Sequence, residues 1–288
     1  MSREALRYTA FAAAEGGGNP AGVVLDARGL SDREMLAVAA DVGYSETAFL
    51  FPEEDWTGSP SDEGRQRQVT VRYFSPRAEV PFCGHATIAT AVALAERYGT
   101  GVLDLDTIAG RVPVATRRQD QQVQATLTSV EPSQDPLPPD LLAHTLAALG
   151  WTHDMLDDSL PPRVAFAGAR HPVLAVRSRD VLAQLAYDYS SLDALMAEQD
   201  WTTMQLIQRE ADDLFHARDP FPPGGVVEDP ATGAAAAAFG GYLRAIGLVP
   251  PSGQIRIHQG DDMGRPSLLL VDIPEQGGIE VTGSASQI

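Results

Sequence analysis

Cys83 and His85 are the first residues whose types and spacing could support catalysis. They lie in the segment EVPFCGHATIATA, residues 79–91, and Cys83 is the only cysteine among 288 residues. The thiol could act as a nucleophile or a base, could bind a metal together with His85, or could be a buried structural group. Each alternative needs different partner residues.

The sequence argues against the first two roles of Cys83. A racemase with two thiols needs one on each face of the reacting carbon, and a single cysteine excludes that mechanism. A cysteine–histidine nucleophile needs both side chains on one face, which positions i and i+2 of a helix do not share. The six histidines are scattered, so we expect no metal site. A buried structural thiol is the favoured interpretation.

Glu46 and Asp229 are the carboxylates whose positions favour a chemical role. Glu46 begins an apolar segment, ETAFLF, that has the composition of a strand. Burial there would favour the protonated carboxyl, which suits proton transfer, and an exposed glutamate at a strand start is an equal alternative. Asp229 lies shortly before a helix and is either a catalytic candidate or a simple N-cap.

Two helices made almost wholly of small apolar residues are predicted at 85–99 and 231–247. Because they are apolar on nearly every side, we expect each to be buried all round. Gly84 and Gly233 lie at their starts, where the first N–H groups of a helix form a site for an anion. Two such starts would suit a small carboxylate substrate; the alternative is that the glycines only permit tight entry into the helix.

The two halves of the chain share a pattern that indicates an internal duplication. Asn19-Pro20 matches His171-Pro172, and Gly84 matches Gly233 at nearly the same spacing. Each half is expected to wrap a strand-rich shell around its buried helix. A thin jacket of alanines would let such a helix fit inside a small barrel.

Composition excludes several classes of function. The chain has 39 acidic and 21 basic residues and a formal net charge of −18, so we expect no binding to nucleic acid or anionic membranes through bulk charge. One cysteine excludes an internal disulfide framework. No segment is long and apolar enough for a signal peptide or a membrane span, and we expect a soluble cytoplasmic protein.

Several motifs, taken together and in their order along nearly the whole chain, resemble those of the PhzF family of phenazine-biosynthesis isomerases. These motifs are GNPAGVV, YSETAFL, VRYFSPRAEVPFCGHATIATA, VVEDPATGAAAA and QGDDMGRPS. The resemblance implies an α/β (α+β) fold of the diaminopimelate epimerase type. That fold has two pseudo-symmetric domains, each a barrel-like sheet around a central helix, with the active site between them. It also implies a homodimer.

We place the first domain at 1–128 and the second at 129–275, and the resemblance implies a strand at about 276–288 that returns to the first domain. The Pro-rich segment 131–140 is the expected interdomain linker. The polar, turn-rich segment 53–68 is expected to be a surface loop.

The resemblance also implies roles for particular residues. It makes Glu46 the group that moves a proton within trans-2,3-dihydro-3-hydroxyanthranilate. It implies substrate-binding roles for Asn19, Gly84, His85, Asp229, Gly233 and Ala234. The family usually has serine where this chain has Ala234. The missing hydroxyl puts the phenazine substrate in question, although the backbone N–H is retained.

The function expected from these observations is cofactor-independent acid–base isomerisation of a small cyclic or amino carboxylic acid. No nucleotide or flavin motif is present in the sequence. An epimerase or racemase of another small acid is the first alternative. A non-catalytic protein that binds a small ligand in the same cleft is the second.

Overall fold

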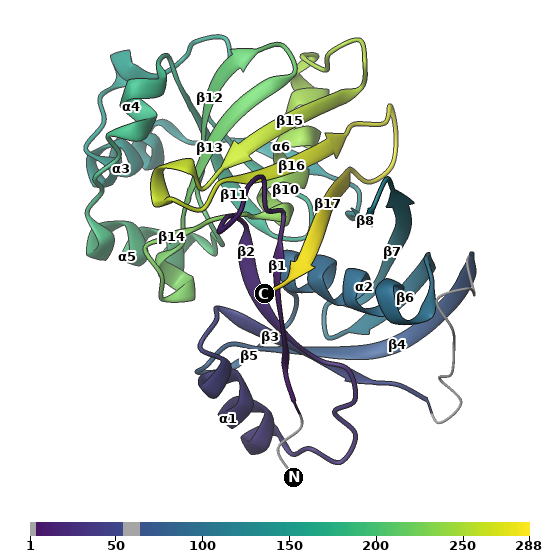
Figure 1. The fold of residues 1–288 in the computed structure, drawn as a ribbon. Coiled ribbons are helices and arrows are strands. Elements are labelled where there is room, and N and C mark those ends of the chain that lie inside the picture. Colours follow the sequence, from purple (N-terminus) through teal and green to yellow (C-terminus); the bar gives the residue numbers. More distant parts are fainter. Residues whose placement is uncertain (1–3, 54–63) are drawn as a thin grey trace. The chain divides into compact units, whose positions relative to one another are not determined.

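The computed structural model describes residues 4–53 and 64–288, which form two compact units. The first unit is Met1–Thr128 with Thr282–Ile288, and the second is Ser129–Val281. Most of the predicted loop at 53–68 lies outside the described residues (Figure 1). Its last residues are not loop, because strand β4 begins at Arg65.

Eight strands of the first unit close into a barrel, in the pairing order β1, β2, β3, β4, β6, β7, β8, β17 and back to β1. The strands of this unit are β1 (Leu6–Ala10), β2 (Asn19–Val24), β3 (Glu46–Phe51), β4 (Arg65–Phe74), β5 (Glu79–Val80), β6 (Gly101–Thr107), β7 (Gly110–Gln119), β8 (Gln122–Thr128) and β17 (Glu280–Gln287). Closure leaves the barrel strands without free edges. Helix α2 (Gly84–Tyr98) contacts β1, β2, β3, β7 and β8, and it is buried from His85 to Ala95 as its apolar sequence predicts.

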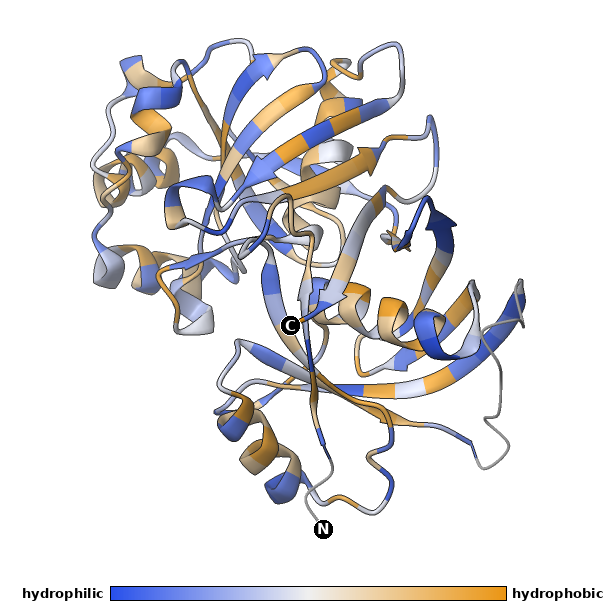
Figure 2. Ribbon diagram, viewed as in Figure 1, coloured by the Kyte–Doolittle hydropathy of each residue, from blue (hydrophilic) through white to orange (hydrophobic). Residues whose placement is uncertain are grey.

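Helix α1 (Asp32–Val42) lies against β3 and β4 of the same unit. Ser31 caps it, and the Ser31 and Glu34 side chains form the reciprocal capping box. Only one of its faces is buried, with Met35 and Ala39 packed towards Phe49 and Phe74. The contrast with α2 follows from sequence, since α2 lacks a polar face until its last turn (Figure 2).

The second unit repeats the order of parallel and antiparallel pairings. In the first unit, β2–β3 and β4–β6 are parallel, and β1–β2, β3–β4 and β6–β7 are antiparallel. In the second unit, β11–β12 and β13–β15 are parallel, and β10–β11, β12–β13 and β15–β16 are antiparallel. Its strands are β9 (Ser133–Pro136), β10 (Arg163–Phe166), β11 (Arg170–Val176), β12 (Gln205–Ala211), β13 (Leu214–Pro220), β14 (Glu228–Asp229), β15 (Gln254–Gln259) and β16 (Ser267–Asp272). The predicted fold class, two pseudo-symmetric barrel-like halves each with a central helix, is confirmed.

Helix α6 (Gly233–Ile246) is the central helix of the second unit and contacts β9, β10, β11, β12 and β16. The alanines at 235–238 are at most 1% exposed. Small side chains are required here, because a Cβ at Gly241 would lie 2.4 Å from Cβ of Pro132. The predicted reason for the alanine-rich sequence, a helix thin enough to fit, agrees with this packing.

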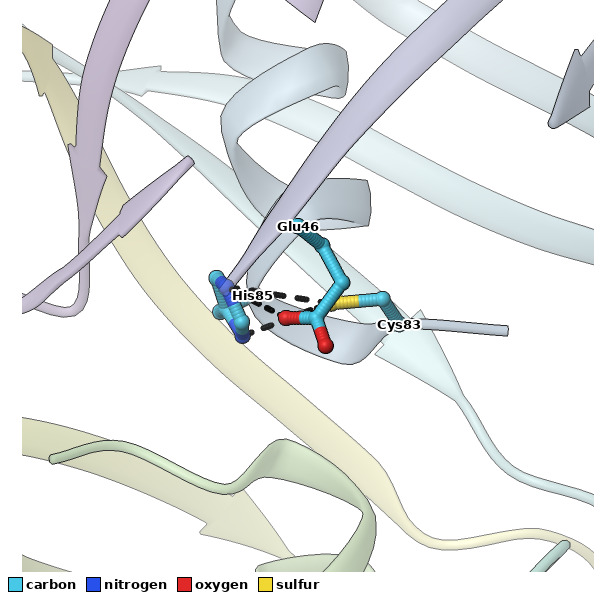
Figure 3. A group of neighbouring side chains, drawn as sticks. All are labelled: Glu46, Cys83 and His85. Atoms are coloured by element: carbon cyan, nitrogen blue, oxygen red, sulfur yellow. Dashed lines mark hydrogen bonds and ion pairs between the residues drawn. The ribbon is translucent and has the colours of Figure 1, made fainter. Parts of the chain in front are cut away.

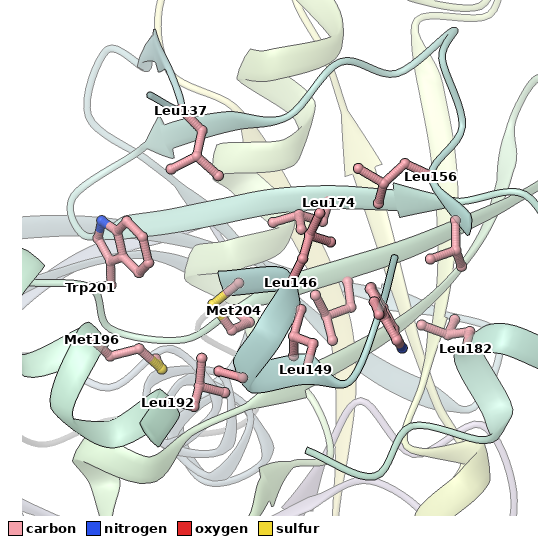
Figure 4. Packing of buried hydrophobic residues seen from close by; sticks show 14 residues of the cluster. Leu137, Leu146, Leu149, Leu156, Leu174, Leu182, Leu192, Met196, Trp201 and Met204 are labelled. Atoms are coloured by element: carbon pink, nitrogen blue, oxygen red, sulfur yellow. The ribbon is translucent and has the colours of Figure 1, made fainter. Parts of the chain in front are cut away.

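A cluster of leucine, methionine and tryptophan side chains forms a further core in the second unit (Figure 4). It lies among helices α3 (Pro139–Leu149), α4 (Arg179–Ala183) and α5 (Tyr189–Gln199) and the strands next to them.

The prediction that 131–140 is an interdomain linker was wrong in conformation, because this segment contains strand β9 and the start of helix α3. Pro139 is acceptable there since the first turn of a helix needs no N–H donor. No helix among residues 4–53 and 64–288 combines the length and apolar character needed to cross a membrane.

Candidate active site

Glu46, Cys83 and His85 meet in the first unit (Figure 3). Cys83 Sγ lies 3.5 Å from Oε2 of Glu46 and 3.4 Å from Nδ1 of His85. Nε2 of His85 lies 3.4 Å from the same carboxylate oxygen. The side chains of His85 and Glu46 are 6% and 12% exposed, so the carboxyl group on which the proton-transfer hypothesis depends is shielded from bulk water.

The expectation that Cys83 and His85 could not face each other was wrong. It assumed that both residues are helical. Cys83 is the N-cap of α2 and has an extended backbone, with φ −147° and ψ 114°, so the spacing rule for helix faces does not apply to it. The thiol is 8% exposed and buried as predicted, but it contacts two ionisable groups and is not a bystander.

A chain of hydroxyl groups fixes the backbone at Cys83. The hydroxyl of Thr87, one turn into α2, donates to the Cys83 carbonyl at 2.7 Å. Tyr73 Oη lies 2.6 Å from Thr87 Oγ1 and donates to it, because the Thr87 proton is already committed. Burial raises the pKa of Tyr73, which keeps this donor protonated. The start of α2 is therefore held to β4 by side chains that cannot reach solvent.

Asn19 sets the orientation of the imidazole. Its Nδ2 lies 3.0 Å from Nδ1 of His85, and Asn19 is 1% exposed. An amide nitrogen only donates, so Nδ1 accepts and the proton of a neutral His85 lies on Nε2, towards Glu46 and the Ser45 hydroxyl at 3.3 Å. Gly18 permits this placement, since it has φ +80° and a Cβ there would lie 2.6 Å from the Ala10 carbonyl.

The second unit places Asp229 beside the start of α6. Asp229 Oδ2 accepts a hydrogen bond from the Thr232 hydroxyl at 2.6 Å. Gln259 completes the turn, because its amide nitrogen donates to the Asp229 carbonyl at 2.7 Å and its amide oxygen accepts from the Thr232 N–H at 3.1 Å. Gly233 and Ala234 follow as the first residues of the helix, where N–H groups have no intrahelical acceptor.

The carboxyl group of Asp219 belongs to the residue that pairs with Asp229 in the neighbouring strand. Asp219 lies in β13 and is fully buried. Burial, and then the neighbouring Asp229 charge, raise the pKa of Asp219 well above its usual range. The amide of Gln205, with its nitrogen turned towards this carboxyl group, donates to both oxygens at 3.0 and 2.8 Å.

A family model described as phenazine biosynthesis-like protein matches residues 8–288. This chain belongs to the PhzF family. An uncharacterized isomerase of Mesorhizobium japonicum is 33% identical over 295 residues, covering 96% of this chain and 93% of that protein. The trans-2,3-dihydro-3-hydroxyanthranilate isomerase of Pseudomonas aeruginosa is 32% identical over 286 residues, covering 96% and 94%. A solved structure of a predicted epimerase from Pseudomonas aeruginosa has a TM-score of 0.83 at 25% identity and covers 100% of this chain and 97% of that one.

Membership in the PhzF family makes the chain an enzyme of the isomerase class, as predicted. The structure groups the predicted site residues by unit. Asn19, Glu46 and His85 meet in the first unit, with Gly84 adjoining His85 in α2. In the second unit, Asp229 ends β14, and Gly233 and Ala234 are the first two residues of α6.

Four site neighbours were missed from the sequence: Ser45, Gln205, Asp219 and Gln259. Two of them had a signal. Ser45 stands next to Glu46 in YSETAFL, and Gln259 begins QGDDMGRPS, so both lie in motifs that carried the family resemblance. Gln205 and Asp219 had none, because nothing in their local sequence shows that β12 and β13 bring them together.

Proposed function

We propose that this PhzF-family enzyme shifts a proton within a small cyclic or amino carboxylic acid without a cofactor. Glu46 gives a proton to one carbon, and its carboxylate then takes a proton from a neighbouring C–H. The observation that carries the proposal is the shielded Glu46 carboxyl group with His85 and Cys83 within 3.5 Å of its Oε2. A positioned acid–base group of this kind contributes roughly 10²–10⁴-fold.

The spacing of the proton carriers favours isomerisation over epimerisation. Inverting a carbon needs one group on each face, and reacting atoms about 3–3.5 Å from the carbon on both sides lie about 6–7 Å apart. Glu46 Oε2 and Cys83 Sγ are 3.5 Å apart, which is too close for these two groups to act on opposite faces of one carbon. When a proton is added to one carbon and another is removed from its neighbour on the same face, a double bond moves and no stereocentre is inverted.

The remaining predicted residues are proposed to bind substrate. Asn19, His85 and the Gly84 N–H would hold polar groups next to the reacting carbon. Asp229 would accept from an amino or hydroxyl group, and the N–H groups of Gly233 and Ala234 would bind a carboxylate or another acceptor. A homodimer and a cytoplasmic location stay predictions, to be tested by light scattering and by fractionation.

The test is deuterium incorporation from D₂O into trans-2,3-dihydro-3-hydroxyanthranilate and related dihydroaromatic and amino acids, followed by NMR. Glu46→Gln keeps the shape of the side chain and removes its titratable proton. We expect at least a 100-fold slower exchange in this variant. Glu275→Gln is the matched control, because Glu275 is exposed, and its exchange rate should equal that of the wild type.

Exchange that continues unchanged in Glu46→Gln would refute the assignment of the proton carrier. Saturable binding of the same acids by the wild type, with no exchange and no double-bond shift in any of them, would instead support a non-catalytic binding protein. Inversion of a stereocentre with solvent deuterium at that carbon would support an epimerase.

A further inference from the structure

The three side chains of the Glu46 cluster also have the chemistry of a metal site. Thiolate, imidazole and carboxylate are the ligand types that Zn²⁺ takes in proteins. Among the described residues, these are the three whose ligand atoms all lie within 4.8 Å of one another. All three side chains are shielded from solvent, whereas surface carboxylates that gather by chance are exposed.

The separations of the ligand atoms match a tetrahedral site. For a tetrahedral zinc ion, sulfur lies about 3.5 Å from a nitrogen or oxygen ligand, and nitrogen lies about 3.4 Å from oxygen. Here Cys83 Sγ is 3.8 Å from His85 Nε2 and 3.5 Å from Glu46 Oε2, and Nε2 is 3.4 Å from Oε2. Each edge is within about 0.3 Å of the expected value. Sγ lies nearer to Nδ1 of His85, at 3.4 Å, than to Nε2, at 3.8 Å, so the imidazole must turn to direct the Nε2 lone pair at an ion shared with the thiolate.

Contrary to the expectation from the scattered histidines, we propose that Glu46, Cys83 and His85 form a site for a thiophilic divalent ion, Zn²⁺ or Cd²⁺, with the fourth position open. Binding releases the thiol proton, and the carboxyl proton of the protonated Glu46, to solvent; it leaves a thiolate and a carboxylate, whose two negative charges balance the ion. Mg²⁺ and Ca²⁺, which need more oxygen ligands, are rejected. The proposed isomerisation needs no metal, and an ion here would inhibit it by occupying the proton carrier.

Asn19 would act as the supporting residue of this site. When Nε2 binds a metal, the imidazole proton moves to Nδ1, and the neighbouring group must accept it. Asn19 can do so by turning its amide so that oxygen replaces the nitrogen now 3.0 Å from Nδ1. Asn19→Asp supplies a permanent acceptor of the same shape. It should therefore tighten metal binding while Cys83→Ser abolishes it.

The direct test is titration of the purified full-length protein with Cd²⁺, monitored by the ultraviolet thiolate-to-metal charge-transfer band. Because Cys83 is the only cysteine, this band reports on Cys83 alone. We expect one ion per chain in the wild type and no band in Cys83→Ser. Binding should be at least 10-fold weaker in Glu46→Gln and in His85→Gln, and about 10-fold tighter in Asn19→Asp.

A matched control addresses a second histidine–carboxylate pair among the described residues. His216 Nε2 lies 2.6 Å from Glu210 Oε2 in the second unit, and His216→Gln should leave the band and its midpoint unchanged. Equal Cd²⁺ affinity in the wild type, Glu46→Gln and His85→Gln would show that the thiol binds alone and would overturn the site. A correctly folded wild type that gives no band would do the same.

The binding test is independent of the proposed reaction, and only the predicted inhibition rests on it. If Cd²⁺ binds as described and no candidate acid exchanges deuterium, the metal site stands and the isomerase proposal fails. If exchange occurs and depends on Glu46, equimolar Zn²⁺ should stop it and a chelator should restore it. Exchange that continues at full rate with Zn²⁺ bound would refute the inhibition.

Discussion

Gly22 is required because β2 and β3 approach closely beside the site. Gly22 pairs with Thr47, the residue directly after Glu46. A Cβ at position 22 would lie 2.5 Å from Thr47 Oγ1 and 2.8 Å from its Cγ2. Thr47 is fully buried, so its side chain cannot turn out to solvent to make room. Gly22→Ala should therefore displace β3 and with it the Glu46 carboxyl group.

The expected size of this effect follows from the atoms in conflict. Overpacking of a buried position costs about 1–3 kcal/mol. Thr47→Ala removes both of the closest atoms and leaves only Cβ, which is 3.1 Å from the added methyl group. Most of the cost of Gly22→Ala should thus disappear in the Thr47→Ala background, giving a coupling free energy of about 1–3 kcal/mol.

The measurement is a double-mutant cycle by urea and thermal unfolding of the wild type, both single variants and the double variant. For a protein of this size, the single Gly22→Ala change should lower Tm by roughly 2–10 °C, and the double variant should recover most of that loss. Deuterium exchange into a substrate should be slower in Gly22→Ala and should recover in the double variant. If Gly22→Ala costs the same free energy in both backgrounds, the contact with Thr47 is not its cause.

Three further predictions test other parts of the structure. Burial lowers the pKa of His171 to about 4, so as pH falls the unfolded state takes up the proton before the folded state does. The free energy of unfolding should therefore decrease by about 3 kcal/mol between about pH 6.5 and pH 4. Urea unfolding across this range should show a smaller decrease in His171→Asn. Gly241→Ala should destabilise the protein by about 1–3 kcal/mol despite the better helix propensity of alanine, because its methyl group meets Pro132 at 2.4 Å, and urea unfolding measures this. Ala234→Ser should raise kcat/KM for trans-2,3-dihydro-3-hydroxyanthranilate about 10-fold if the hydroxyl regains one substrate hydrogen bond worth about 1.4 kcal/mol, and an unchanged value would remove Ala234 from the site.

The two buried helices were predictable because their signal is local. A run of small apolar residues after a glycine specifies both the helix and its burial, and α2 and α6 appear where the sequence placed them. The repeat of strand pairings was foreseeable from the matched positions Asn19 and His171. In contrast, β9 was taken for a linker, because its pairing with β10 depends on residues about thirty positions away.

The composition of the site was less predictable for a physical reason. Whether Cys83 faces His85 depends on the backbone angles of one residue at a helix start, and helix periodicity says nothing about that residue. Burial of Glu46 depends on how the strand start packs, which an apolar sequence only suggests. Motif resemblance pointed to particular segments, and the three-dimensional contacts among them had to come from the structure.

The repeat of strand pairings makes the chemical difference between the two units visible. Glu46 pairs with Ala21, two residues after Asn19, and Gln205 pairs with Val173, two residues after His171. Equivalent strand starts thus carry a carboxyl group in one unit and an amide in the other. An amide is neither an acid nor a base near neutral pH, and the Gln205 amide is hydrogen-bonded to the buried Asp219. The first unit thus has an acid–base group at this strand start, and the second unit has a hydrogen-bonding group at the equivalent position, which agrees with the proposal that Glu46 alone carries the proton.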